Sequence, residues 1–253
     1  MTRFGGYASR VVLPRHQVFP LPAQLTIEQA AGFPAVFMTA YFALYELLRL
    51  RPGMVVLVHS AASGFGGALL QLGKSAGCRM VGVVGASHKV DTEKHLGADA
   101  VIDKSREQLW AAAKQLAPEG YDVILDAKGV ETLRQSYQHL APAGKLIVYG
   151  FHSMLPRQGG RPNYARIALD FVRTPRFNLF DLCNDNKSVL AFNLSYLFHK
   201  AELLREGMER LMGWAEGGRI KAPPVTTFPL ERVAEAHRAL ESGSTVGKLV
   251  LTL

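Results

Sequence analysis

The stretch 59–68, His-Ser-Ala-Ala-Ser-Gly-Phe-Gly-Gly-Ala, combines small residues with three glycines, Gly64, Gly66 and Gly67. Small residues let a backbone approach a diphosphate closely, and the first amides of a helix carry partial positive charge that binds it. The spacing departs from a strict G-x-G-x-x-G, so the stretch predicts a dinucleotide site only if it lies between a strand and a helix. A tight turn that binds no ligand is the alternative.

The residues on either side of these glycines supply that setting. Met54–His59 is a mostly apolar run introduced by the turn residues Pro52 and Gly53, which predicts a buried strand. Gly67–Ala76 then predicts a helix that ends at Gly77. We therefore interpret the glycines as the turn between the first strand and its helix, where free amides would grip a diphosphate.

The second strand, Arg79–Val84, indicates which dinucleotide would fit. Sites that select NADH place an acid at the end of this strand to hold the ribose hydroxyls, whereas here the strand runs into Gly85. Ser87 supplies a hydroxyl donor and Lys89 a cation, and both suit the extra 2′-phosphate of NADPH. Lys104, after the third strand, adds a second charge. The alternative is that Lys89 is a solvated lysine in the first turn of a helix, where a cation is unfavourable without an anion nearby.

The wider pattern alternates apolar strands with helices, which predicts an α/β fold with a parallel, doubly wound sheet of the Rossmann type. We expect strands at 54–59, 79–84, 100–103, 122–126 and 145–149, and helices at 67–76, 91–96, 106–116 and 131–140. The strands are continuous apolar runs, as expected when both faces of a sheet are covered. Ser105 is expected to cap the third of these helices.

The flanking segments predict fewer elements. Residues 7–13 are expected to form a strand, and Thr26 with Gln29 predicts a capping box at the start of a helix. Further along, we expect helices at 164–172, 201–217 and 231–241, and strands at 188–197 and 248–253. The rest of 152–187 is basic and predicts irregular structure, and Pro223 and Pro224 predict a loop.

Composition limits the classes of protein to which the chain can belong. The 253 residues carry a formal net charge of +8 and are 48% hydrophobic, which supports a sizeable core. No apolar run of about 18 residues predicts a membrane span, and two cysteines, Cys78 and Cys183, fit a reducing cytoplasm. The basic residues do not form one stripe, so the charge suits a pocket for an anionic cofactor better than a nucleic-acid surface.

Several segments, in their order along the chain, carry a resemblance to a known family. They are Gly5-Gly6-Tyr7-Ala8, Leu25–Pro34, Met38–Tyr41, Ala61–Gly66, Gly82–Gly85 with Lys89, and Val246–Leu251. On these segments the chain resembles the medium-chain dehydrogenase/reductase superfamily, in its zinc-free quinone oxidoreductase branch and particularly its vesicle-amine-transport-protein-like members. The resemblance implies a Rossmann-type domain at residues 34–198, with residual pieces of a GroES-like catalytic domain at 1–33 and 199–253. We expect most of that barrel domain to be missing from the sequence.

The resemblance also implies which residues would bind the cofactor, NADPH. They are Thr39, Ala62, Ser63, Gly64, Phe65, Gly66, Ser87, Lys89, Lys104, Tyr149, Gly150, Phe151, Phe192 and Lys248. Within this set, Thr39 and the segment Tyr149–Phe151 are expected near the nicotinamide, with Phe192 on its other side. The strand that contains Phe192 is expected to join the two subunits of a homodimer.

The activity implied by the resemblance is hydride transfer from NADPH to a small-molecule substrate, either a quinone or an α,β-unsaturated carbonyl compound. Zinc is not expected, because Ala35 and Val36 stand where zinc-dependent relatives have a cysteine ligand. No catalytic residue is assigned: His59 fits a buried structural histidine, and His152 fits a loop residue as well as a substrate contact. The alternative to an enzyme is a non-catalytic dinucleotide-binding or scaffold protein, which the missing barrel favours.

Overall fold

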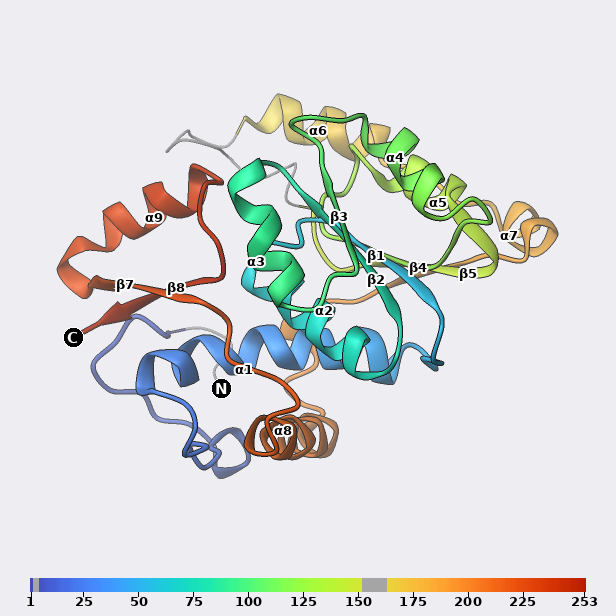
Figure 1. The fold of residues 1–253 in the computed structure, drawn as a ribbon. Helices are drawn as coiled ribbons and strands as arrows, with labels where there is room; N and C mark the ends of the chain where they lie inside the picture. The colour runs from blue at the N-terminus through green and yellow to red at the C-terminus, as the bar shows by residue number, and fades with distance from the viewer. Residues whose placement is uncertain (2–4, 152–162) are drawn as a thin grey trace.

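The computed structural model describes residue 1, residues 5–151 and residues 163–253. Its centre is a parallel sheet of six strands in the order β3-β2-β1-β4-β5-β6 (Figure 1). The strands are β1 (Val55–Val58), β2 (Arg79–Val84), β3 (Ala100–Asp103), β4 (Tyr121–Asp126), β5 (Leu140–Val148) and β6 (Ser188–Ala191). The predicted parallel sheet of the Rossmann type is therefore confirmed. The strand order reverses between β1 and β4, and sheets of this kind bind ligands at the carboxyl ends of the strands at such a point.

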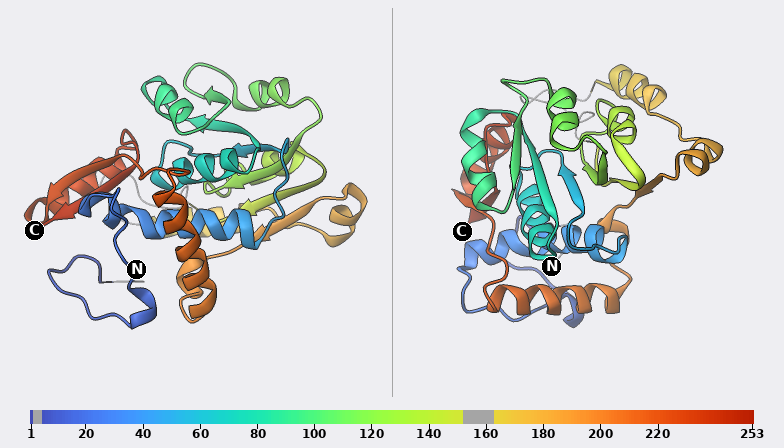
Figure 2. Two further views of the ribbon diagram at one scale, coloured as in Figure 1. Left: turned by 60° about the horizontal axis from the view of Figure 1, so that its bottom comes forward. Right: turned by 45° about the vertical axis from the view of Figure 1, so that its right-hand side comes forward.

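Helices cover both faces of this sheet, as Figure 2 shows. One face packs against α1 (Ile27–Tyr41) and α2 (Gly64–Ser75), with α8 (Ala201–Glu216) packed on α1, and the other face packs against α4 (Leu109–Leu116) and α5 (Leu133–Gln138). Alternate strand residues feed the two cores, so that Val56 and Val58 lie in one and Leu57 in the other, all fully buried. Burial on both faces explains why the strands are continuously apolar in the sequence.

Four further helices lie in the described part of the chain. They are α3 (Val90–His95), α6 (Tyr164–Arg173), α7 (Leu179–Asp185) and α9 (Val233–Glu241). Short 3₁₀ turns occur at Arg15–Gln17 (η1), Ser87–Lys89 (η3), Leu194–Tyr196 (η5) and Leu230–Arg232 (η6), and a π-helical turn at Phe42–Glu46 (η2) follows α1. None of the helices in the described part of the chain combines the length and the apolar character needed to cross a membrane.

The carboxyl-terminal residues form a second, smaller sheet beside the first. Strands β7 (Val225–Pro229) and β8 (Lys248–Thr252) run parallel and are connected by α9, at one side of the molecule (Figure 1). The sequence predicts β8 but not β7, because Pro223 and Pro224 just before β7 suggested a loop. Residues 242–247, which we call the strap, lead from α9 to β8, and a β-bridge pairs Gly247 of the strap with Ser63.

Besides the missed β7 and the start of α2, four sequence predictions about these elements are wrong in detail. Residues 7–13 form no strand, and Val12 is 99% exposed, because no described strand lies beside them to supply hydrogen bonds. The strand expected over 188–197 ends at Ala191, after which the Asn193 side chain caps the turn η5. Residues 152–187 were expected to contain one helix, but α7 forms as well, capped by Asn178.

The fourth concerns the start of α4. The helix was expected to begin at residue 106 with Ser105 as its cap, but it begins at Leu109 with Gln108 as its cap, through a bond from the Ala111 amide. Ser105 is unavailable because both its amide and its hydroxyl donate to Asp103.

The starts of the two helices that lead into the site also differ in how well the sequence predicted them. The prediction for α1 is confirmed, since Thr26 and Gln29 form the expected capping box. Helix α2, by contrast, begins three residues earlier than expected, at Gly64. The glycines therefore belong to the first turn of this helix rather than to a loop before it.

Candidate functional site

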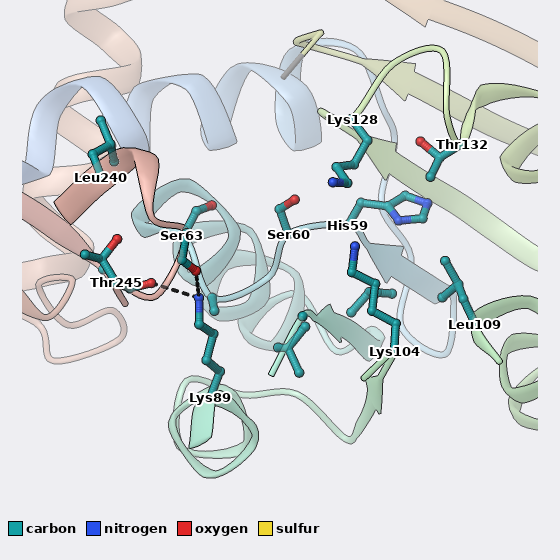
Figure 3. A pocket seen from close by; sticks show the side chains of 16 residues that line it. His59, Ser60, Ser63, Lys89, Lys104, Leu109, Lys128, Thr132, Leu240 and Thr245 are labelled. Atoms are coloured by element: carbon teal, nitrogen blue, oxygen red, sulfur yellow. Dashed lines mark hydrogen bonds between the residues drawn. The ribbon is translucent and has the colours of Figure 1, made fainter. Parts of the chain in front are cut away.

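A cavity of about 370 Å³ opens at the carboxyl ends of β1 to β4. Its walls come from the β1–α2 turn, from the residues that follow β2, β3 and β4, and from the strap (Figure 3). Among the residues that line it are His59, Ala62, Ser63, Lys89, Lys104 and Lys128. The volume lies within the range of small-molecule pockets. The position is the one at which a sheet of this strand order binds nucleotides.

The glycine-rich turn forms one wall and is tightly built. Ser63 caps α2, and its Oγ accepts a hydrogen bond of 3.0 Å from the amide of Gly66. A β-carbon at Gly66 would lie 2.3 Å from the carbonyl oxygen of Ala61, so no side chain fits there. The glycine is therefore required for α2 to start directly beside β1, as the sequence predicted for a strand–turn–helix unit.

The strap covers part of this turn. The amide of Gly64 donates to the carbonyl of Gly247 at 2.9 Å, and the amide of Gly247 donates to Ala62 at 3.1 Å. The side chain of Lys248 lies across Gly64, since a β-carbon at Gly64 would be 2.6 Å from its Cγ. Burial lowers the pKa of Lys248. The sequence predicted free amides here, whereas the amides of Gly64 and Gly66 already have partners. A diphosphate at this turn would therefore compete with Gly247 for the Gly64 amide.

Three lysines surround the cavity, as Figure 3 shows. The Nζ of Lys89 donates to the carbonyls of Gly243 and Thr245 in the strap, at 2.5 and 3.1 Å. Burial of Lys89 lowers its pKa. Lys104 follows β3 and lies next to Gly85, and Lys128 follows β4 with its Nζ 3.7 Å from Glu131. Positive groups from three strand ends thus face one space, which suits an anionic ligand.

Ser87 has a different partner from the one the sequence predicted. Its hydroxyl donates to Oδ2 of Asp103 at 2.5 Å, and Ser87 itself does not line the cavity. Hydrogen bonds from Ser105 and from Ser87 lower the pKa of Asp103, so this carboxylate is ionised at neutral pH. An acid is therefore present near the rim after all, at the end of β3 rather than of β2.

The residues expected around the nicotinamide do not line this cavity: Thr39, Tyr149, Gly150, Phe151 and Phe192. The Tyr149 ring packs against Phe65 with centroids 4.3 Å apart, which places Tyr149 next to the first turn of α2. Phe192 packs on Phe42 at 4.9 Å. The Thr39 hydroxyl donates to the carbonyl one turn earlier in α1. The structure therefore groups Ala62, Ser63, Lys89 and Lys104 of the predicted set at the cavity, with Gly64, Phe65, Gly66 and Lys248 beside the same turn.

His59 belongs to a buried network below the cavity. Its Nε2 lies 3.1 Å from Oγ of Ser136, which in turn donates to Asp126 at 2.9 Å. Burial lowers the pKa of His59 against the opposing effect of Asp126, so the ring is neutral at physiological pH. Because the serine hydroxyl donates to the carboxylate, these three residues are not arranged as a nucleophile, a base and an orienting acid.

Sequence reasoning missed Thr132 and the strap among the cavity residues. Thr132 follows β4, and a signal existed, because strand ends of a parallel sheet converge at one edge. The strap had no such signal, since Gly243 lies 154 residues from Lys89. His152 lies outside the described residues. Within the described ranges, no three His, Cys, Asp or Glu side chains lie close enough together to hold a metal ion.

Comparison with known proteins identifies the family. Residues 96–251, more than half of the chain, match the family described as zinc-binding dehydrogenase. The synaptic vesicle membrane protein VAT-1 homologue of Danio rerio is 31% identical over 252 residues, which cover 100% of this chain and 52% of that protein. The human VAT-1 homologue is 30% identical over 99% of this chain and 63% of its own length. The chain thus spans between half and two thirds of these relatives.

Solved structures lead to the same group of proteins. The quinone oxidoreductase of Thermus thermophilus, described together with its NADPH complex, has a TM-score of 0.80 and 30% identity over 98% of this chain and 74% of its own. The Escherichia coli quinone oxidoreductase complexed with NADPH has a TM-score of 0.75 and 26% identity, over 92% of this chain and 67% of its own. The chain therefore belongs to the medium-chain dehydrogenase/reductase superfamily, in the branch of the VAT-1 homologues and quinone oxidoreductases.

Proposed function

We propose that this chain is an NADPH-dependent oxidoreductase that reduces a quinone or an α,β-unsaturated carbonyl compound without zinc. The observation that carries the proposal is the cavity at the reversal of strand order, with Lys89, Lys104 and Lys128 around it. NADPH carries more negative charge than NADH because of its 2′-phosphate, and clustered cations match that charge. The NADPH complexes of the Thermus and Escherichia quinone oxidoreductases support the same choice of nucleotide.

The residues of the chain would hold the nucleotide by its phosphates. Lys89 and Lys104 flank Gly85 and would neutralise the 2′-phosphate, while Lys248, which lies across Gly64, would approach the diphosphate. A glycine at residue 85 leaves room for the phosphate between the two lysines. When bound, NADPH supplies the hydride, and the protein binds the cofactor, orients it and excludes water. We propose a cytoplasmic location and a homodimer joined through the edge strand β6.

Titration of the chain with NADPH and with NADH, followed by calorimetry, tests the choice of nucleotide. We expect the chain to bind NADPH more tightly than NADH. We expect Lys89→Ala to weaken the binding of NADPH by about tenfold or more, because an ion-paired hydrogen bond to a phosphate is lost. The Kd of NADH should change by much less in this variant. Lys94→Ala is the matched control, since Lys94 is an exposed lysine of α3, the helix that directly follows Lys89, and does not line the cavity. Tighter binding of NADH by the unsubstituted chain would contradict the proposal.

A second candidate is a protein that binds the dinucleotide without turnover. One observation favours it: residues 7–13 have no described strand beside them. Steady-state oxidation of NADPH with 1,4-naphthoquinone as the acceptor separates the two candidates. Turnover supports the reductase. Saturable binding of NADPH with no oxidation above the uncatalysed rate supports the second candidate.

A further inference from the structure

The hydroxyl of Ser87 lies next to residues of the cavity wall and already donates a hydrogen bond. Ser87 belongs to the turn η3 and stands between Gly85 and Lys89, both of which line the cavity. Its Oγ donates to Oδ2 of Asp103 at 2.5 Å. The parallel pairing of β2 and β3 sets Val84 opposite Asp103, so the ends of these two strands bring the pair together.

A serine hydroxyl has one proton and two lone pairs. Because the proton of Ser87 points to Asp103, the lone pairs are all that Ser87 can offer to a ligand. The ribose 2′-hydroxyl of NADH can donate a hydrogen bond to such a group. The 2′-phosphate of NADPH presents mainly acceptor oxygens at neutral pH and cannot. In its present direction, the Ser87 hydroxyl therefore matches NADH, whereas Lys89 matches NADPH.

The direction of this hydrogen bond is held by the surroundings of Asp103. Its other carboxylate oxygen, Oδ1, accepts from the amide and the hydroxyl of Ser105 at 2.9 and 2.6 Å, and its own amide donates to Glu107 at 3.1 Å. These contacts leave Oδ2 facing Ser87. The hydrogen bonds from the two serines also lower the pKa of Asp103, so that the carboxylate has no proton to donate back.

We propose that Asp103 is a positioning residue that sets the direction of the Ser87 hydroxyl and thereby limits the preference for NADPH that the lysines create. The inference rests on the proposed function, because it places the 2′-phosphate at the Gly85–Lys89 rim. Asp103 touches no part of the nucleotide in this arrangement. It acts on selectivity through Ser87 alone.

The substitution Asp103→Asn tests this role. The Oδ1 of asparagine still accepts from Ser105, so its amide group replaces Oδ2 and becomes a donor to Ser87. The Ser87 proton is then free to turn towards a phosphate. We expect the ratio of the Kd of NADH to the Kd of NADPH to rise by about tenfold, measured by calorimetry with both nucleotides. Asp181→Asn is the control, because it removes the same charge from the exposed surface of α7 and should leave the ratio unchanged.

A double-mutant cycle with Ser87→Ala separates positioning from simple charge. Arg106 lies 3.9 Å from Oδ2 of Asp103, so Asp103→Asn also frees a cation that would attract a phosphate. If Asp103 acts through the serine, Asp103→Asn changes the ratio by less than twofold when alanine replaces Ser87. An undiminished tenfold effect in that background would overturn the inference, because charge alone would then explain it.

The single variant Ser87→Ala gives a second test that does not depend on the folding of the asparagine variant. We expect this variant to bind NADH several-fold more weakly and to change the Kd of NADPH by less than twofold. A selective loss of NADPH binding would show that Ser87 donates to the phosphate and would contradict the inference. Failure of the unsubstituted chain to bind either nucleotide would contradict the proposed function itself. Normal binding with an unchanged ratio in Asp103→Asn would contradict the role of Asp103 and leave the proposed function standing.

Discussion

Gly66 is the residue of the glycine turn with the least space around it. A β-carbon there would lie 2.3 Å from the carbonyl oxygen of Ala61, and 2.6 Å from the Cα and the carbonyl carbon of the same residue. Backbone atoms cannot swing aside, so Gly66→Ala must push α2 away from β1. We expect a loss of about 1–3 kcal/mol in the free energy of unfolding, measured by urea denaturation, together with loss of nucleotide binding.

Gly213→Ala is the matched control for that substitution. Gly213 also lies inside a helix, α8, but its β-carbon would meet nothing within 4 Å and the residue is exposed. Alanine should therefore stabilise the chain by up to about 1 kcal/mol through helix propensity. Equal stabilities for the two variants would mean that the turn adapts and that Gly66 is not sterically required.

Glu93 makes the stability of the chain depend on pH. Its side chain is fully buried, and neither carboxylate oxygen has a hydrogen-bond partner among the described residues. Burial raises the pKa of Glu93 to about 7, although Lys89 opposes the shift. The folded state therefore holds a proton that the unfolded state releases near its ordinary pKa of 4.5. Stability contributed by this group is present below that value and is lost as the pH rises through 7.

Glu93→Gln removes this dependence, because the amide is neutral at every pH. We expect the variant to be more stable than the unsubstituted chain at pH 8, by up to about 3 kcal/mol, and similar to it at pH 5. Thermal and urea unfolding at the two pH values measure the difference. An equal gain at both pH values would show that the charge of Glu93 is not the cause.

For single residues, the sequence predicted which side chains lie at the strand ends better than it predicted their hydrogen-bond partners. The positions of Lys89 and Lys104 followed from the strand ends, and both line the cavity. The hydroxyl of Ser87 was also identified, but it donates its hydrogen bond to Asp103. Neither that bond nor the bond from Lys89 to Gly243 follows from residue types alone, because each depends on how separate segments meet in the fold.

At the scale of elements, β6 has an edge that no described strand covers. The amide of Phe192 donates to Val148 in β5, so by alternation along a strand the amide of Ala191 points outwards. A homodimer through β6 would use that amide. We expect Ala191→Pro to convert the dimer to a monomer in sedimentation analysis, because proline has no amide proton. Ala191→Thr keeps the proton and should remain dimeric, and a monomeric unsubstituted chain would contradict the proposal.

The sequence predicted most elements of the central sheet and failed where an element depends on a distant partner. The five expected strands of residues 54–149 are all present within a few residues of their predicted bounds. The apolar segment 7–13 has the composition of a strand but no described strand to pair with. Strand β7 is the opposite case, a strand that the sequence did not predict. It forms directly after two prolines because it pairs with β8.

At the scale of the whole molecule, one rule explains where the cavity lies. Parallel strands end at a common edge, so residues that follow β1, β2, β3 and β4 had to lie together although up to 69 positions separate His59 from Lys128. The rule says nothing about the strap, which forms the remaining wall of the cavity and leads into a different sheet.

The strap also has a consequence for the order in which the site is assembled. Proteins are synthesised from the amino terminus and domains begin to form as they emerge, so the glycine turn and Lys89 exist before Gly243, which is 154 residues further on. Until those later residues are translated, the Gly64 amide and the Lys89 ammonium lack the carbonyl partners they have in the finished fold. If the proposed nucleotide binds this turn, Gly247 would compete with it for the Gly64 amide only after the strap has been synthesised.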